Sequence, residues 1–215
     1  RAENNKLRTV GPPMVGAEAK IAEDGEILLR GESMMKGYWN LPEVTAAAII
    51  DGWLHTGDIG KFDEEGSLVI TDRKKDIIVN SGGDNISPQR IEGLLTLETE
   101  ISQAMVYGDD KPYLVAVLWP DEDFMREFAK EKGIDNNIDA LGTNEEFRKK
   151  IRSAIDIVNR RVSTIEKVRS FIFAETAFSI DNEMLTPSMK IRRHKIRDAY
   201  GAQLNALYQR KRSGS

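Results

Sequence analysis

The sequence contains no cysteine and only two histidines, His55 and His194. The lack of cysteine excludes disulfides, zinc–thiolate sites, thiol redox chemistry and a cysteine nucleophile. Two histidines make a histidine-rich metal site unexpected. No apolar run approaches the roughly 20 residues that a membrane-spanning helix needs, and no signal peptide follows Arg1. Any chemistry must therefore come from carboxylates, amines, hydroxyls and backbone groups.

Strong charge of one sign is also absent. Lys and Arg number 31 against 35 Asp and Glu, which gives a net charge of −4, and 40% of the residues are hydrophobic. This composition is typical of a folded globular protein and differs from that of disordered chains. A basic stretch over residues 192–212 could suggest a nucleic-acid or membrane surface. Acidic residues elsewhere outweigh it and no set of stacking aromatic residues is interleaved with it, so we expect no nucleic-acid partner.

The length of 215 residues allows one or two domains. The first residue is arginine, so either the start was processed or the chain is a piece of something longer. The five consecutive charged residues 72–76 cannot all be buried together and predict an exposed connection. We therefore place a domain boundary in this segment. Short strand patterns and turns dominate the first part.

The second part alternates between apolar strands and amphipathic helices. Its expected order is strand, helix, strand, strand, helix, helix, strand and helix, which predicts an α+β domain with a three-stranded sheet and packed helices. The stretch 113–119 is apolar on both faces and should be the central strand. Thr143, followed by Glu146, has the spacing of a capping box and predicts a helix start at Thr143. Residues 180–190 read as a loop.

Short polar motifs recur in a fixed order along the chain. They are Gly37-Tyr38-Trp39-Asn40, Pro42-Glu43-Val44-Thr45, Asp51-Gly52-Trp53-Leu54, Thr56-Gly57-Asp58, the run from Asp72 to Glu92, and Leu185-Thr186-Pro187-Ser188-Met189-Lys190. In order and spacing these motifs resemble the late motifs of the adenylate-forming superfamily of acyl-CoA synthetases, luciferases and peptide-synthetase adenylation domains. The last motif, which has no Ser-Gly-Lys, is most similar to that of bacterial long-chain fatty acid–CoA ligases.

The resemblance implies a two-step enzyme with two domains. In such enzymes a carboxylic acid and ATP give an acyl-adenylate and pyrophosphate, and the CoA thiol then displaces AMP to form acyl-CoA. A mobile C-terminal domain rotates between the steps. Residues 1–72 would be the truncated, mainly β distal end of the N-terminal domain, residues 73–76 the hinge, and residues 77–215 the whole C-terminal domain. The implied partners are ATP, a fatty acid, CoA and the enzyme's own N-terminal domain. The implied place is the cytoplasm, with contact at the inner membrane surface as a further hypothesis.

The resemblance also assigns roles to single residues. Lys190 would be the catalytic lysine of the adenylation step, Asp58 and Arg73 would bind the nucleotide, and Lys75 would be the hinge residue. The loop Ser81-Gly82-Gly83 would line the CoA tunnel.

Each of these residues also has a plain structural interpretation. Asp58 could be an ordinary turn residue, and Arg73 a solvated linker charge. The loop 81–83 could be a strand-to-helix turn that needs positive φ, and Lys190 one more lysine of a basic tail. Asp72, Lys74 and Asp76 are expected to be ordinary solvated charges. His55 and Glu92 are expected to have structural roles.

Two motifs of the same superfamily are missing from the sequence. One is the Ser/Thr/Gly-rich phosphate-binding loop, and the other is Tyr-Gly-x-Thr-Glu, whose Glu helps to hold Mg²⁺. Both would lie upstream, so we assign no metal ligand to this chain and expect it to be inactive alone. Two alternatives stay open: an adenylating enzyme that loads a carrier-protein thiol, and a non-enzymatic module that binds nucleotide, CoA or protein.

Overall fold

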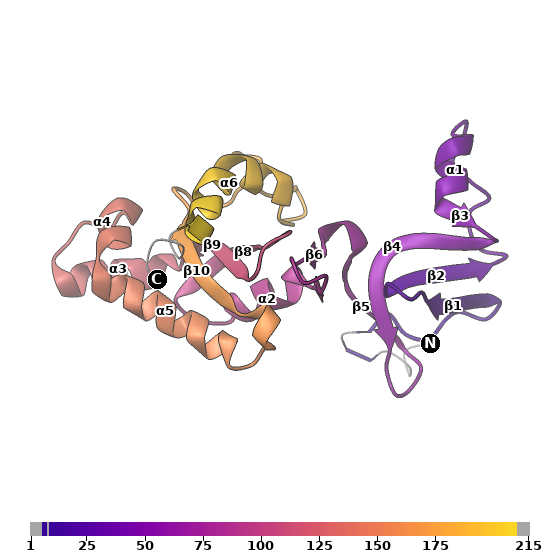
Figure 1. Ribbon diagram of the computed structural model, residues 1–215, viewed down its shortest axis with the longest axis horizontal. Helices are drawn as coiled ribbons and strands as arrows, with labels where there is room; N and C mark the ends of the chain where they lie inside the picture. Colours follow the sequence, from indigo (N-terminus) through magenta and orange to yellow (C-terminus); the bar gives the residue numbers. More distant parts are fainter. Residues whose placement is uncertain (1–5, 8, 210–215) are drawn as a thin grey trace. The chain divides into compact units, whose positions relative to one another are not determined.

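The computed structural model describes residues 6–7 and 9–209 (Figure 1). The chain forms two compact units, Arg1–Ile77 and Ile78–Ser215. The first is mainly β and the second is mixed. Within the described part, no helix is long and apolar enough to cross a bilayer.

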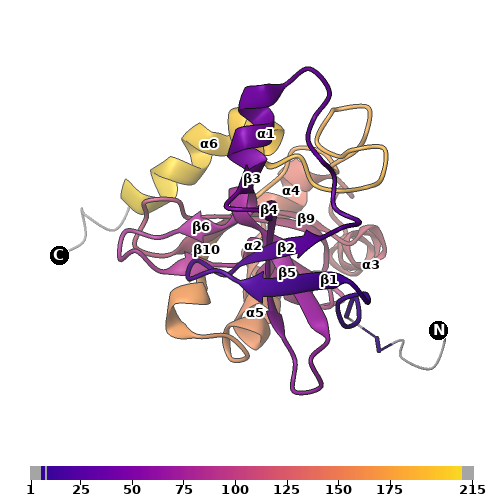
Figure 2. The same ribbon diagram turned by 90° about the vertical axis from the view of Figure 1, so that its right-hand side faces the viewer.

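The first unit is built on an antiparallel five-stranded sheet, in which β1 and β2 are neighbouring arrows in Figure 2. The strand order is β1-β2-β4-β3, and β5 pairs with β4. A turn at Asp24 and Gly25 joins β1 to β2, because Gly25 adopts a φ of +85° and Asp24 Oδ1 accepts the backbone N–H of Glu26. The elements are β1 (Ala17–Ile21), β2 (Glu26–Gly31), α1 (Pro42–Ala48), β3 (Ile49–Ile50), β4 (Trp53–Phe62), β5 (Leu68–Arg73) and the short 3₁₀ helix η2 (Lys74–Asp76).

Strand β4 arches away from β2 in the middle of its length. Glu26 pairs with Ile59, and Leu28 pairs with His55, so β4 uses four steps where β2 uses two. The two additional residues form a bulge over residues 56–58. The bulge lifts a polar segment out of an otherwise regular ladder, which is a common way to aim a side chain at a site.

The second unit contains the predicted three-stranded sheet. Strands β8 (Ile101–Tyr107), β9 (Leu114–Pro120) and β10 (Val168–Phe173) lie in the order β10-β9-β8. β9 runs antiparallel to β8 and parallel to β10. Leu114 to Leu118 are fully buried, so the prediction of a central strand is confirmed. A separate two-strand ribbon pairs β6 (Ile78–Val79) with β7 (Asn85–Ile86).

Helices cover both faces of this sheet. Leu114, Ala116 and Leu118 of β9 belong to a core shared with α2, α3, α4 and α5, whereas Val115 and Val117 belong to a core shared with α6. Alternate side chains of a strand point to opposite faces, so a strand that is apolar throughout needs cover on both. The helices are α2 (Pro88–Leu95), α3 (Glu122–Lys132), α4 (Ile138–Thr143), α5 (Glu145–Asn159) and α6 (Arg193–Gln209). The predicted α+β class is confirmed.

The predicted start of α5 is wrong by one residue. Asn144, and not Thr143, is the N-cap, since its side chain accepts the backbone N–H groups of Glu146 and Phe147. Thr143 ends α4, a helix that the sequence pattern did not predict, and its hydroxyl donates back to carbonyls of that helix. The Thr-x-x-Glu spacing was therefore coincidental.

Candidate functional site

Asp58 and Arg73 form an ion pair at the end of the β4–β5 ladder. They are direct partners in the strand register, and Arg73 Nε lies 2.8 Å from Asp58 Oδ1. The Asp58 side chain is 21% exposed and that of Arg73 is 53% exposed. Within residues 6–7 and 9–209, neither side chain has a second ion-pair partner. The pair thus presents a carboxylate and a guanidinium together at a solvent-accessible place.

The buried Glu26 lies behind this pair. Its Oε1 accepts the backbone N–H of Gly57 at 2.8 Å, and its Oε2 lies 2.9 Å from both His55 Nδ1 and Lys74 Nζ. Burial by itself raises the pKa of Glu26, but the hydrogen bonds from His55, Lys74 and Gly57 together lower the pKa below its ordinary value. The carboxylate is therefore ionised at neutral pH, so His55 Nδ1 carries the proton of their hydrogen bond. His55 has the structural role that we expected.

The charged segment 72–76 is less solvated than we expected. Asp72 is 2% exposed and accepts the backbone N–H of Arg73. Lys74 Nζ lies 2.7 Å from Asp24 Oδ2 as well as close to Glu26, and these hydrogen bonds raise the pKa of Lys74. The expectation of a solvated charge is wrong for Asp72, whereas Lys74 is exposed as expected but is paired with two carboxylates. Lys75 is exposed and makes no ion pair with any described residue.

The loop Ser81-Gly82-Gly83 connects β6 to β7 and is exposed. Asn80, which is 8% exposed, organises it: Asn80 Oδ1 accepts the N–H groups of Gly82 and Asp84, each at 2.9 Å. Gly83 has a φ of +85°, which favours glycine. The loop is thus a defined turn that leaves open space beside the backbone at Gly83, whereas the side chains of Asn80 and Asp84 lie next to Gly82.

Lys190 lies on a second defined turn. Thr186 N donates to Lys190 O at 2.8 Å, and Lys190 N donates to Thr186 Oγ1 at 3.0 Å. Met189 between them has a φ of +60°, which is uncommon for a residue other than glycine. The Lys190 side chain is exposed and has no carboxylate partner in the described part of the chain. Its ammonium group is therefore presented from a fixed backbone.

Glu92 anchors the helix that follows this turn. Arg193, the first residue of α6, places Nη1 at 2.8 Å from Glu92 Oε1 and Nη2 at 2.5 Å from Oε2. Glu92 is 5% exposed and also accepts the backbone N–H of Val106 in β8. This agrees with the structural role expected for Glu92 and links α2, α6 and β8 through one carboxylate.

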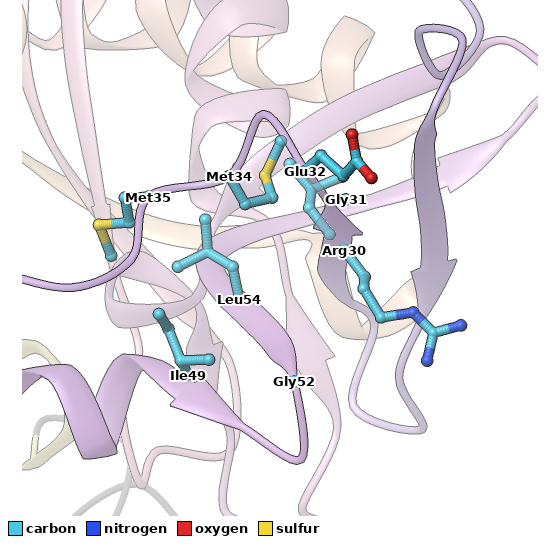
Figure 3. Close-up of a pocket in the computed structure, with 9 residues that line it drawn as sticks. Arg30, Gly31, Glu32, Met34, Met35, Ile49, Gly52 and Leu54 are labelled. Atoms are coloured by element: carbon cyan, nitrogen blue, oxygen red, sulfur yellow. The ribbon is translucent and has the colours of Figure 1, made fainter.

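A pocket of about 360 Å³ lies elsewhere in the first unit. In Figure 3 the side chains of Met34, Ile49 and Leu54 gather around it, and the guanidinium of Arg30 points away. None of the predicted site residues lines it. The lining comprises residues 29–32, 34, 35, 49, 52 and 54.

The structure therefore brings together Asp58 and Arg73 in the first unit, and it places Lys190 and the loop 81–83 in the second. The sequence patterns did not indicate Glu26, Asn80 and Arg193, whose hydrogen bonds fix the segments that carry these residues. The only local signal for Glu26 is a lone carboxylate at the start of the apolar strand Ile27-Leu28-Leu29. Among the described residues, no group of three or more His, Asp and Glu residues is placed to hold a metal ion.

Residues 75–212 match the family described as the AMP-binding enzyme C-terminal domain. Long-chain-fatty-acid–CoA ligase FadD15 of Mycobacterium tuberculosis is 37% identical over 205 residues, which are 94% of this chain and 34% of that protein. Long-chain-fatty-acid–CoA ligase 6 of Homo sapiens is 35% identical over 189 residues, which are 86% of this chain and 27% of that protein. The chain thus spans about a third of the length of these curated relatives.

A solved structure has the same fold. The A-PCP didomain of carboxylic acid reductase from Segniliparus rugosus, in complex with AMP, has a TM-score of 0.75 and 25% identity, and the match covers 94% of this chain and 29% of that one. These findings confirm the resemblance that the motif order indicated. The chain belongs to the AMP-binding enzymes and is homologous to the C-terminal part of fatty acyl-CoA ligases.

Proposed function

We propose that this chain is the C-terminal part of an ATP-dependent fatty acyl-CoA synthetase. The observation that carries the proposal is the family match over residues 75–212, with the Asp58–Arg73 pair directly upstream of it. In the first step, the substrate carboxylate attacks the α-phosphorus of ATP and pyrophosphate leaves. In the second, the CoA thiol attacks the acyl carbon and AMP leaves with the bonding electrons.

Asp58 and Arg73 would bind the nucleotide. A carboxylate has two acceptor oxygens and can accept from the two adjacent hydroxyls of a ribose. A guanidinium has several donors in a fixed fork, so Arg73 suits a ribose or phosphate oxygen beside that carboxylate. Their ion pair, 2.8 Å across, holds both groups in one orientation before a nucleotide arrives.

Lys190 would act in the adenylation step. An ammonium group near the reacting atoms can contact both the carboxylate and the α-phosphate, and it offsets the negative charge that develops in the transition state. The Thr186–Lys190 turn presents this side chain without a competing carboxylate among the described residues. The Lys190 ammonium group would therefore have no ion pair to break before it enters the active site.

The loop 81–83 and Lys75 would act in the thioester step. Gly82 and Gly83 expose backbone that a thin pantetheine arm can approach closely. The exposed Lys75 would be the hinge between the two poses of the C-terminal domain, since a long charged side chain can stay solvated in both. CoA is thus a substrate here, and Mg²⁺ would be held by residues upstream of Arg1. We place the reaction in the cytoplasm; nothing in the described part of the chain supports the hypothesis of membrane contact.

The test of Lys190 uses the longer enzyme that contains this chain. We expect Lys190→Ala to slow ATP–pyrophosphate exchange by about 100-fold or more, because a preorganised charge at the transition state is lost. Lys195→Ala is the matched control: Lys195 belongs to the same basic stretch but pairs with Glu183 at 2.6 Å, and its loss should leave exchange unchanged. An unchanged exchange rate in Lys190→Ala would exclude the proposed role.

A second experiment separates this function from its alternatives. The acyl-adenylate is formed first, and discharge of the acyl group is then measured with and without free CoA. Discharge that requires CoA supports the synthetase, whereas discharge that requires a carrier protein supports the loading enzyme. We expect the 215-residue chain alone to give no exchange, because it contains no phosphate-binding loop.

A further inference from the structure

Glu26 receives donors from two separate segments of the first unit. Gly57 and His55 belong to β4, and Lys74 begins η2. A carboxylate that is 3% exposed is strongly disfavoured unless such donors surround it. The three contacts therefore depend on one another, and the loss of the charge weakens all of them.

The β4 contacts fix the bulge that carries Asp58. Gly57 N donates to Glu26 Oε1 at 2.8 Å, and Thr56 Oγ1 donates to Ile27 O at 2.7 Å. Thr56 Oγ1 also accepts the backbone N–H of Asp58 at 3.1 Å. The two additional residues of β4 are thus pinned from the β2 side, and the direction of the Asp58 side chain follows from that.

The Lys74 contact fixes the start of the hinge. Lys74 Nζ is held by Asp24 and Glu26, whereas the next side chain, Lys75, is exposed and unpaired among the described residues. The N–H of Ile77 returns to Arg73 O at 3.2 Å, and the second compact unit begins at Ile78. Lys74 is therefore held in the first unit by its side chain, whereas no side-chain hydrogen bond or ion pair holds residues 75–77 in the described part of the chain.

We propose that Glu26 is a positioning residue that ties the nucleotide-facing bulge 56–58 to Lys74, and thereby confines the hinge to residues 75–77. The meaning of the bulge and of the hinge rests on the proposed function. The contacts of Glu26 with β4 and Lys74 do not depend on the proposed function, because they all lie within the first unit. Glu26 would thus couple the orientation of Asp58 to the position of Lys74, the last anchored residue before the hinge.

The test is amide hydrogen exchange of the 215-residue chain with Glu26→Gln. The substitution keeps the size of the side chain and removes its charge. We expect the amides of Gly57 and Ile77 to exchange about tenfold faster, because one lost charge-assisted hydrogen bond destabilises each segment. Glu18→Gln is the matched control: Glu18 pairs with Arg30 on the same sheet and should change neither amide.

Lys74→Gln removes the charge of Lys74 from its contact with Glu26, and it tests the proposal even if the Glu26→Gln variant does not fold. In this variant we expect the amide of Ile77 to exchange faster. The amide of Gly57 should also exchange faster, but by a smaller factor. Unchanged exchange at Ile77, in either variant, would overturn the proposal. No substrate is present, so the result stands apart from the proposed function. In the longer enzyme, the same Glu26→Gln should raise the KM for ATP more than it lowers kcat.

Discussion

The contact between Arg193 and Glu92 decides where α6 begins. Both terminal nitrogens of Arg193 face the two oxygens of a carboxylate that is 5% exposed. We predict that Arg193→Ala lowers the free energy of unfolding of the second unit by about 3 kcal/mol, because it leaves a buried charge without its partner. Exchange of the β9 amides, which open with that unit, measures the loss.

The neighbouring Arg192 supplies the control. Its guanidinium lies 3.8 Å from Glu183, whose side chain is 59% exposed. Exposed pairs of this kind contribute little, so Arg192→Ala should change stability by less than about 0.5 kcal/mol. If both variants lost the same free energy of unfolding, the contact between Arg193 and Glu92 would contribute no more than an exposed ion pair.

At the scale of single residues, short motifs in the sequence indicated the candidate ligand-binding residues, but nothing in it indicated the side chains that hold them in place. Asp58, Arg73 and Lys190 stand in short motifs, and they remain proposals with a defined geometry. Glu26 and Lys74 lie 48 positions apart, and only the fold brings them together. A run of charges looks solvated in a sequence, although the β4–β5 pairing buries Asp72.

At the scale of elements, the start of α5 allows a direct test of which residue, Asn144 or Thr143, caps the helix. Asn144 accepts two backbone N–H groups, and Thr143 is exposed and bonds only to carbonyls of α4. We predict that Asn144→Ala costs about 1 kcal/mol of stability, the usual effect of a lost N-cap. Thr143→Ala should cost clearly less. Exchange of the first α5 amides measures both, and a larger loss for Thr143→Ala would restore the capping-box interpretation.

Elements with a strong local pattern were predictable, and irregular ones were not. The continuous apolar run 113–119 indicated the central strand β9, because a strand that is apolar on both faces needs cover on both. The helix α4 has 6 residues, which is too short to show a helical period, and the bulge in β4 depends on its register with β2. Register is a property of two strands at once, so a single strand pattern does not contain it.

At the scale of the whole molecule, the chain forms two compact units that meet in sequence at Ile77 and Ile78, and the two core clusters on either side of the β8–β9–β10 sheet both belong to the second unit. The run of charged residues 72–76 predicted a domain boundary in this segment. The assignment of the first unit to a larger domain, and of Lys75 to a hinge, remains a prediction. It matters because a small domain that uses two poses needs freedom at few positions and rigidity on both sides of them.

Lys75→Pro in the longer enzyme tests this arrangement. Proline fixes φ near −65° and restricts the preceding residue, so it removes rotation where we place the hinge. One pose then becomes favoured, and the half-reaction that needs the other pose should slow by about tenfold more than its counterpart. Pyrophosphate exchange and acyl transfer to CoA, measured separately, report the two steps. Lys75→Ala keeps the rotation and should affect both steps equally and weakly. If Lys75→Pro also slows both steps equally, the pivot lies elsewhere, and the anchoring of Lys74 by Glu26 would then have no bearing on domain rotation.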